Sequence, residues 1–157
     1  MDEESQRTLV HLIRTQRVAA LGTLRQNAPF VSMVLCAPAP DFSAFFIHIS
    51  RLAHHTQDIL QDARVSLMIA QADDGSQDPQ TLARVSLQGE AVELPAITAG
   101  HAAAKAVYLE RFPLAAFNFG LGDFALFRIA PKTARYVAGF GRIFNLDWSV
   151  FTATSGW

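Results

Sequence analysis

The chain has 157 residues, half of them hydrophobic, and a formal net charge of −1 at pH 7. This length suits one domain with a full core, so we expect residues 1–157 to form a single domain. Nucleic-acid-binding proteins usually carry a basic patch, which this charge argues against. No apolar run reaches the roughly 18 residues of a membrane span, and the acidic start lacks a signal-peptide pattern. We therefore expect a cytoplasmic protein that binds neither nucleic acid nor membrane.

Residue counts restrict the chemistry further. The single cysteine, Cys36, can form neither an intrachain disulfide nor a thiolate metal site. The five histidines show no HExxH spacing, so no metal site is expected. There is no GxSxG motif and no pair of acidic residues typical of catalysis, so no catalytic residue is assigned. Twelve phenylalanines indicate additional buried surface, such as a subunit interface.

The spacing of apolar residues predicts short strands with a few helices between them. Helices are predicted at residues 3–16, 52–62 and 95–112, with Pro95 in the first turn of the last one. Strands are predicted at residues 17–24, 29–36, 42–49, 64–71, 81–94, 123–129 and 133–139. The apolar phase of the 81–94 strand changes near Gly89, which predicts a β-bulge there. Antiparallel strands at this spacing favour a barrel, mainly β with flanking helices (α+β).

The strand at 42–49 and the helix at 52–62 meet at residues 50–56, SRLAHHT. A helix N-terminus attracts anions through its unpaired N–H groups and its dipole. Five residues there add hydroxyl or cationic donors that would suit a phosphate: Ser50, Arg51, His54, His55 and Thr56. Alternatively, Ser50 only caps the helix and the histidines are solvated. Because neighbouring residues cannot easily face one ligand, at most one of the two histidines belongs to a site.

Two arginines each allow two interpretations. Arg17 either balances the dipole at the end of the first helix or acts as a second phosphate ligand. Arg84, at the start of the fifth strand, is either a charge at the barrel rim or a ligand donor. The residues alone leave both choices open.

Several segments, in their order and spacing, resemble the pyridoxamine 5'-phosphate oxidase-like FMN-binding split-barrel family. RVAALGTL at 17–24 and PFVSMV at 29–34 resemble its opening hairpin, and SRLAHHT resembles its phosphate-binding turn. ARVSLQGEA at 83–91 resembles its long central strand. GDFALFRI at 122–129 and ARYVAGFG at 134–141 resemble its haem-utilisation branch more closely. The similarity extends from residue 9 to residue 147.

This resemblance implies a six- to seven-stranded antiparallel split β-barrel that forms a homodimer, with FMN in two equivalent clefts between the subunits. The FMN-binding residues implied by position are Arg17, Val18, Ala19, Ala20, Ile47, Ser50, Arg51, His55, Thr56, Arg84 and Arg142. Of these, Arg17 and the 50–56 turn would hold the phosphate, whereas the backbone of residues 18–20 would line the ring or ribityl chain. Ile47 and Arg84 would also contact the cofactor, and Arg142 would reach it from the other subunit.

Two departures from the family pattern narrow the expected activity. Leu52 stands where true pyridoxamine-phosphate oxidases carry a lysine, and RIFNLDW at 142–148 lacks their substrate-binding arginine and histidine. Vitamin B6 oxidation is therefore not expected. The haem-utilisation branch uses a histidine near the C-terminus as a haem ligand, whereas no histidine follows His101 in this chain.

The function expected from the sequence is therefore that of an FMN-dependent oxidoreductase of unknown substrate, in which the flavin N5 passes a hydride or electrons. Two alternatives stay open: a haem-binding or haem-utilisation protein on the same split barrel, and a flavin-binding protein without turnover. The phosphate donors of the turn favour FMN. Haem would instead need an axial ligand, and the candidates are His48, His54, His55 and His101.

Overall fold

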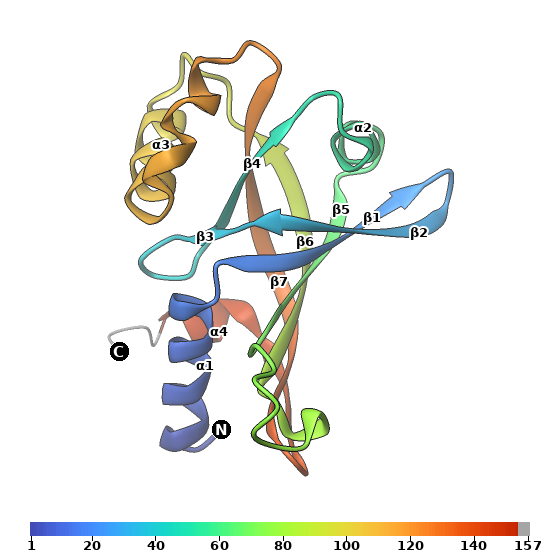
Figure 1. Ribbon diagram of the computed structural model, residues 1–157, viewed down its shortest axis with the longest axis vertical. Coiled ribbons are helices and arrows are strands. Elements are labelled where there is room, and N and C mark those ends of the chain that lie inside the picture. The colour runs from blue at the N-terminus through green and yellow to red at the C-terminus, as the bar shows by residue number, and fades with distance from the viewer. Residues whose placement is uncertain (154–157) are drawn as a thin grey trace.

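The computed structural model describes residues 1–153 as one antiparallel sheet with helices around it (Figure 1). The helices are α1 (Glu3–Thr15), α2 (His54–Gln61), α3 (Ala99–Arg111) and α4 (Trp148–Ala153), with short 3-10 helices η1 (Pro79–Thr81), η2 (Pro113–Ala116) and η3 (Asn118–Gly120). The strands are β1 (Val18–Arg25), β2 (Ala28–Leu35), β3 (Ala37–Pro38), β4 (Phe45–Ser50), β5 (Arg64–Ala70), β6 (Arg84–Glu93), β7 (Phe124–Gly139) and β8 (Arg142–Asp147).

The strand order is β2-β1-β5-β6-β7-β4-β3, with β8 paired to β7, and every pairing is antiparallel. The expected mainly β split barrel with flanking helices is confirmed. The predicted opening hairpin is also confirmed, because β1 and β2 pair along their whole length around a turn at Gln26 and Asn27. Both turn residues have positive φ, which Asn tolerates better than most residues.

Alternation along the strands produces two apolar clusters. The larger cluster fills the barrel and includes Leu21, Ile47 and Leu67, all completely buried. The smaller cluster lies between β4 and α3 and includes Phe46 and Tyr108. Strand β4 contributes to both clusters, because its alternate residues point to opposite faces and both faces are covered.

The bulge predicted near Gly89 is confirmed, because the register of β6 against β7 shifts between Gln88 and Gly89. The two separate strands predicted at 123–129 and 133–139 are wrong: they are one continuous strand, β7. Pro131, between the two predicted strands, lies opposite Gly89 at the shift, where a missing N–H donor is tolerated.

The C-terminal segment departs furthest from the sequence prediction. Within residues 1–153 the sheet has eight strands rather than six or seven: two of the seven predicted strands are joined in β7, and the two-residue β3 and the C-terminal β8 were not predicted. In β8 the side chains of Phe144 and Leu146 pack against the barrel core. Helix α4 then places Trp148 in the core, where its indole Nε1–H donates to the carbonyl oxygen of Phe42 at 2.8 Å.

Helix boundaries differ from prediction by a few residues. Helix α3 begins after Thr98, whose hydroxyl accepts a hydrogen bond from the His101 N–H, so Pro95 lies before the helix rather than in its first turn. Of the helices in the described part of the chain, none is long and apolar enough to pass through a membrane.

Gly89 is required by close packing at the bulge. A Cβ atom there would lie 2.2 Å from the Ala130 carbonyl oxygen, which belongs to the backbone and cannot move freely. We expect Gly89→Ala to lower the free energy of unfolding by about 2–4 kcal/mol in urea denaturation, in the range of overpacked sites. Gly100→Ala is the matched control: its Cβ meets nothing, and alanine favours helix by about 1 kcal/mol. Equal stability of Gly89→Ala and wild type would show that the bulge does not depend on glycine.

Candidate functional site

The turn that follows β4 holds its own hydroxyl donor in an internal hydrogen bond. The Ser50 hydroxyl donates to Asp123 Oδ2 at 2.9 Å and accepts from the Leu52 N–H at 3.1 Å. The Arg51 N–H donates to the Asp123 carbonyl oxygen at 2.6 Å. Ser50 is not the helix cap considered above, because the N-cap of α2 is Ala53. The turn is therefore joined to the residue that leads into β7.

Arg51 is also engaged within the chain. Its guanidinium makes a two-pronged ion pair with Glu93 at the end of β6, with Nη1 3.2 Å from Oε2 and Nη2 on Oε1. The hydrogen bond to Glu93 raises the pKa of Arg51. Both side chains are partly exposed, so the pair adds only about 1 kcal/mol to stability at most. Its main effect is to place a carboxylate beside the predicted phosphate donors.

The remaining donors of the turn differ in access. Thr56 is completely buried, and its hydroxyl donates to the Ser50 carbonyl oxygen at 2.6 Å. His54 is exposed and its ring lies 6.5 Å from that of Phe30. His55 is half-buried, and burial lowers its pKa. The structure thus gathers Ser50, Arg51, His55 and Thr56 in one turn, as the sequence suggested, but with three of the four already hydrogen-bonded.

Helix α2 is fixed to the β1–β2 hairpin by a buried carboxylate. Asp58 is 5% exposed and accepts from the Thr23 hydroxyl at 2.9 Å and from Arg25 Nε at 3.1 Å. The Arg25 guanidinium also lies 4.4 Å over the ring of Phe30. These contacts attach α2 to the end of β1 that is remote from Arg17.

Arg17 lies away from the turn. Strand β1 has eight residues at about 3.3 Å each, so Arg17 is about 26 Å from the Arg25 end of the strand. Its guanidinium is exposed and lies 5.2 Å over the ring of Phe112. The neighbouring residues Val18, Ala19 and Ala20 line a cavity of about 360 Å³ on the outer face of β1 and β5.

The other three predicted ligands lie at separate places. Ile47 is completely buried in the barrel core, so only its backbone could meet a ligand. Arg84 Nη1 donates to the Leu82 carbonyl oxygen at 2.9 Å. Arg142 binds the start of α1, with Nη2 2.8 Å from Asp2 Oδ1 and 2.7 Å from the Ser5 hydroxyl. Whether these residues contact a cofactor stays a prediction.

A second group of side chains lies around His48, on the outer face of β4. The His48 ring stacks on that of Phe119, with centroids 3.7 Å apart and planes 5° apart. Tyr108 and Phe124 approach the same ring at 5.8 Å and 5.2 Å. His48 is 9% exposed, and its buried Nδ1 has no hydrogen-bond partner within the part of the chain that the structure describes.

Sequence reasoning considered His48 as a haem ligand but missed the residues around it. The helical spacing of His101, Lys105 and Tyr108 places them on one side of α3. That spacing is the signal that could have identified this face. The carboxylates Asp123 and Glu93 were also missed, because their pairing with the turn depends on the sheet topology.

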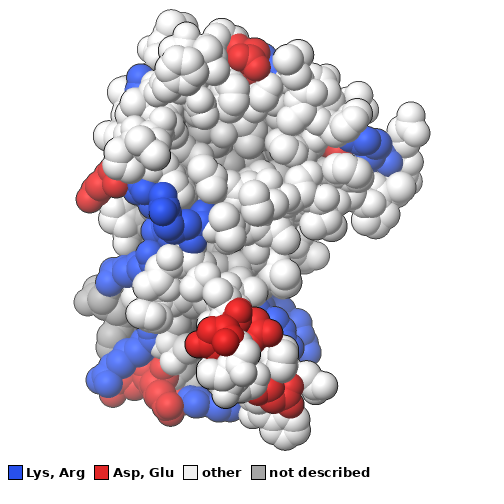
Figure 2. Space-filling view, in the orientation of Figure 1, with Lys and Arg blue, Asp and Glu red and all other residues white. Residues whose placement is uncertain are grey.

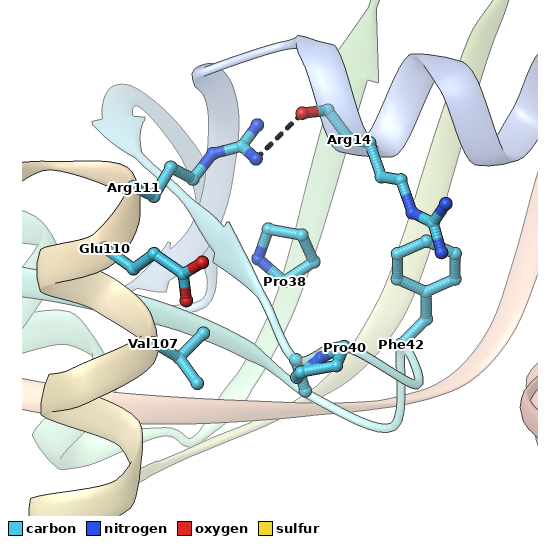
Figure 3. Close-up of a pocket in the computed structure, with 8 residues that line it drawn as sticks. Arg14, Pro38, Pro40, Phe42, Val107, Glu110 and Arg111 are labelled. Atoms are coloured by element: carbon cyan, nitrogen blue, oxygen red, sulfur yellow. Dashed lines mark hydrogen bonds between the residues drawn. The ribbon is translucent and has the colours of Figure 1, made fainter.

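Basic side chains gather between α1 and α3 (Figure 2). Arg111 extends from α3 and donates through Nη1 to the Arg14 carbonyl oxygen at 2.9 Å, so it caps the C-terminal end of α1 (Figure 3). A cavity of about 390 Å³ lies beside it and is also lined by Phe42 and by the acidic side chain of Glu110. The side chain of Arg111 therefore has a structural task that accounts for its position.

Comparison with known proteins identifies the fold and its relatives. The model of a family described as "CREG, beta-barrel" matches residues 3–152. The chain is 37% identical over 121 residues to the chloroplastic non-canonical haem oxygenase HOZ of Arabidopsis thaliana. That alignment covers 76% of this chain and 35% of HOZ, so the chain spans about a third of its relative.

Two solved structures show the same architecture. A haem-binding protein from Mycobacterium smegmatis aligns with a TM-score of 0.85 and 25% identity, over 98% of this chain and 61% of that one. A Clostridium acetobutylicum protein of the pyridoxinephosphate oxidase family aligns with a TM-score of 0.71 and 12% identity, over 96% and 99%. The latter likeness shows the fold alone. The resemblance to pyridoxamine 5'-phosphate oxidase-like split barrels, with relatives on the haem side, is confirmed.

The buried imidazole predicts an acid-sensitive stability. Burial, aided by the charges of His101 and Lys105, lowers the pKa of His48 to about 4, against about 6.5 in an unfolded chain. The unfolded state therefore binds the proton first as pH falls from 7 to 4, and the free energy of unfolding drops by roughly 1–3 kcal/mol. The contribution of the neutral His48 to the free energy of unfolding is fully present above about pH 6.5 and is lost as the pH falls toward 4.

Urea denaturation of wild type and His48→Phe across that pH range measures the effect. The free energy of unfolding is plotted against pH for each protein, and the difference between the two slopes gives the contribution of His48. His55, whose pKa is also lowered, titrates in both proteins and cancels. Identical pH slopes would contradict the burial of a neutral imidazole at this position.

Proposed function

Because the chain belongs to the CREG β-barrel family, on a split-barrel fold with haem-related and flavin-related members, we propose that it is a haem-binding protein. The observation that carries the proposal is the pairing of the 50–56 turn with carboxylates of the same chain. Ser50 is bonded to Asp123 and Arg51 to Glu93, so the donors that would hold an FMN phosphate are engaged. Similarity to a haem oxygenase and to a haem-binding protein supports haem as the ligand.

Electrostatics explain why this pairing weighs against a flavin phosphate. Two like unit charges about 5 Å apart repel by about 3 kcal/mol at an effective dielectric constant of about 20. A phosphate entering the turn would meet the carboxylates of both Asp123 and Glu93 and would have to break their hydrogen bonds. Repulsion of this size exceeds the gain from one charge-assisted hydrogen bond, about 1.5–3 kcal/mol. Haem has no need of a phosphate site.

An FMN-dependent oxidoreductase, or a flavin protein without turnover, is the second candidate. A specific observation favours it: the backbone of residues 18–20 borders an open cavity on the outer face of the sheet, beside the exposed Arg17. This is where the family resemblance would put the flavin ring. If FMN binds there, its phosphate would be held by residues outside the 50–56 turn, including residues of a second subunit.

We also propose that the chain forms a homodimer through the outer face of β1, β2 and β5. Large apolar side chains lie exposed side by side there, with Val31 67%, Met33 72%, Leu35 40% and Met68 41% exposed. The register places Met33 and Met68 on either side of Ala20, so they form one continuous patch. Contiguous apolar patches of this kind mark protein–protein interfaces. A second copy would bury the same patch symmetrically.

Ligand titrations test haem against FMN. Wild type is expected to bind hemin, seen as a shifted and sharpened Soret band, and to bind FMN weakly or not at all by flavin fluorescence. Replacing the two carboxylates, Glu93→Gln with Asp123→Asn, should raise the affinity for FMN more than tenfold, since each charge removed is worth at least about 1.4 kcal/mol. Tight FMN binding by wild type, without hemin binding, would overturn the haem proposal.

The control for this variant is Asp73→Asn with Asp74→Asn, which removes the same charge from an exposed loop. Its affinity for FMN should equal that of wild type. A gain in the control as large as in the turn variant would assign the effect to net charge rather than to the turn.

The dimer is tested by Met33→Asp, which places a charge at the centre of the patch. Light scattering during gel filtration should give twice the chain mass for wild type and the chain mass for the variant, because a buried unpaired charge is costly. Ile97→Asp is the control, since Ile97 is 97% exposed outside the patch, and it should remain a dimer. A monomeric wild type, or a dimeric Met33→Asp, would refute this interface.

A further inference from the structure

Three arginine side chains gather where the end of α1 meets α3. Arg14 belongs to the last turn of α1, Arg17 follows that helix, and Arg111 reaches across from α3. The guanidinium carbons of Arg17 and Arg111 lie 5.2 Å and 5.9 Å from the centre of one ring, that of Phe112. Neither of these two arginines forms an ion pair with a carboxylate in the part of the chain that the structure describes. Positive charge is therefore in excess at this end of α1.

Capping of α1 uses only part of the hydrogen-bonding capacity of Arg111. Its two Nη atoms donate to carbonyl oxygens at the end of that helix, whereas its Nε is buried and has no acceptor among the described residues. Burial lowers the pKa of Arg111, and the nearby charge of Arg17 lowers it further. A cation that is partly removed from water without a counter-charge is costly, and an anion placed beside it offsets that cost.

A cavity of about 390 Å³ opens beside these side chains. Arg14 and Arg111 line it together with the apolar side chains of Pro38, Pro40 and Val107 (Figure 3). A cavity of about 150 Å³ accommodates benzene, so this one has room for a single ring with a short chain. Apolar walls with a few charged groups are typical of the sites that bind small molecules.

The wall of this cavity that comes from β3 and the turn after it is held rigid. Proline fixes the backbone φ at Pro38 and Pro40. Phe42 has a φ of 58°, in the left-handed region that a bulky residue rarely adopts. Its carbonyl oxygen accepts from the Trp148 indole at 2.8 Å, and its N–H donates to the Ala39 carbonyl oxygen at 2.9 Å. Strained residues held in this way concentrate at ligand sites, and a preformed wall lowers the entropic cost of binding.

Glu110 sets the charge that the ligand must carry. Its exposed side chain lines the same cavity, so the lining holds two arginines and one glutamate, a net charge of +1. A single carboxylate balances that charge, and a guanidinium binds a carboxylate through two parallel hydrogen bonds. The apolar walls would contact the rest of the ligand. A monocarboxylate with an apolar body therefore matches the cavity better than an inorganic anion does.

We propose that this cavity binds a small organic acid, a monocarboxylate with an apolar body about one ring in size. The carboxylate lies between Arg14 and Arg111, and the body packs on the apolar walls. No residue that lines this cavity also lines the cavity beside residues 18–20 or belongs to the 50–56 turn. The proposal therefore does not depend on whether the chain binds haem or FMN.

Titration of the full chain with phenylacetate, followed by nitrogen–proton correlation NMR spectra, tests the proposal. Saturable shifts are expected at the Nε–H signal of Arg111 and at the backbone N–H of Ala39 and Val107. Phenylacetamide keeps the ring without the charge, and inorganic phosphate keeps a charge without the ring. Both are expected to bind at least tenfold more weakly than phenylacetate. Equal binding of phenylacetate and either of these compounds, or no saturable binding of phenylacetate, would overturn the proposal.

Arg14→Gln removes one charge from the cavity and should weaken phenylacetate binding about tenfold. The matched control is Arg7→Gln, which removes the same charge from an exposed position on the same helix, outside this cavity. Its affinity should equal that of wild type. An unchanged affinity in Arg14→Gln, or an equal loss in both variants, would refute the assignment of the carboxylate to this cavity.

Two further variants keep both arginines. Glu110→Gln removes a like charge from the cavity and should strengthen phenylacetate binding roughly threefold. Val107→Trp fills the cavity, leaves every charge in place and should abolish binding. Weaker binding by Glu110→Gln would contradict the charge balance. Binding that persists in Val107→Trp would place the anion on the surface of the molecule and overturn the proposal.

Discussion

Burial of β4 on both faces is the constraint on which the rest of the structure depends. Phe45, Ile47 and Ile49 point into the barrel, and Phe46 and His48 point outward. Most strands of an antiparallel sheet have one solvated face, but this strand is covered by the barrel core on one side and by α3 on the other. A polar residue in the middle of such a strand is largely shielded from water, as the 9% exposure of His48 shows. Strand β4 thus holds the imidazole of His48 among aromatic side chains. The turn of residues 50–56 begins at the end of the same strand.

That turn braces the barrel rather than standing open to an anion. Its serine is bonded to the residue that leads into β7, and its arginine is paired with the last residue of β6. The turn therefore connects β4 to the ends of two other strands. Each contact is partly exposed and adds little to stability, but together they place two negative charges where a phosphate would need donors. The turn resembles a phosphate site in sequence, but its contacts suit it better to joining strand ends than to binding a phosphate.

The sequence predicted the local structure well and the partners of each side chain poorly. The hairpin of β1 and β2 and the long β6 could be predicted from the alternation of apolar residues, and the bulge from the change of that alternation near Gly89. The division of β7 into strands at 123–129 and 133–139 was wrong, because Pro131 lies opposite the bulge in β6, where no N–H donor is needed. The roles of Asp123 and Glu93 could not be predicted, since they lie 73 and 42 residues from their partners in the turn. A family resemblance assigns phosphate donors by their position in the sequence, but it does not show which carboxylates bind those donors in the folded chain.

We propose that this barrel binds haem and that carboxylates of the same chain close the turn at residues 50–56 to a phosphate. The most direct measurement is the absorption spectrum of the wild-type protein after incubation with equal amounts of hemin and FMN and passage through gel filtration. We predict a Soret band that elutes with the protein and no flavin bands. Flavin bands that elute with the protein, with hemin left in the small-molecule fractions, would contradict haem binding and a turn closed to phosphate.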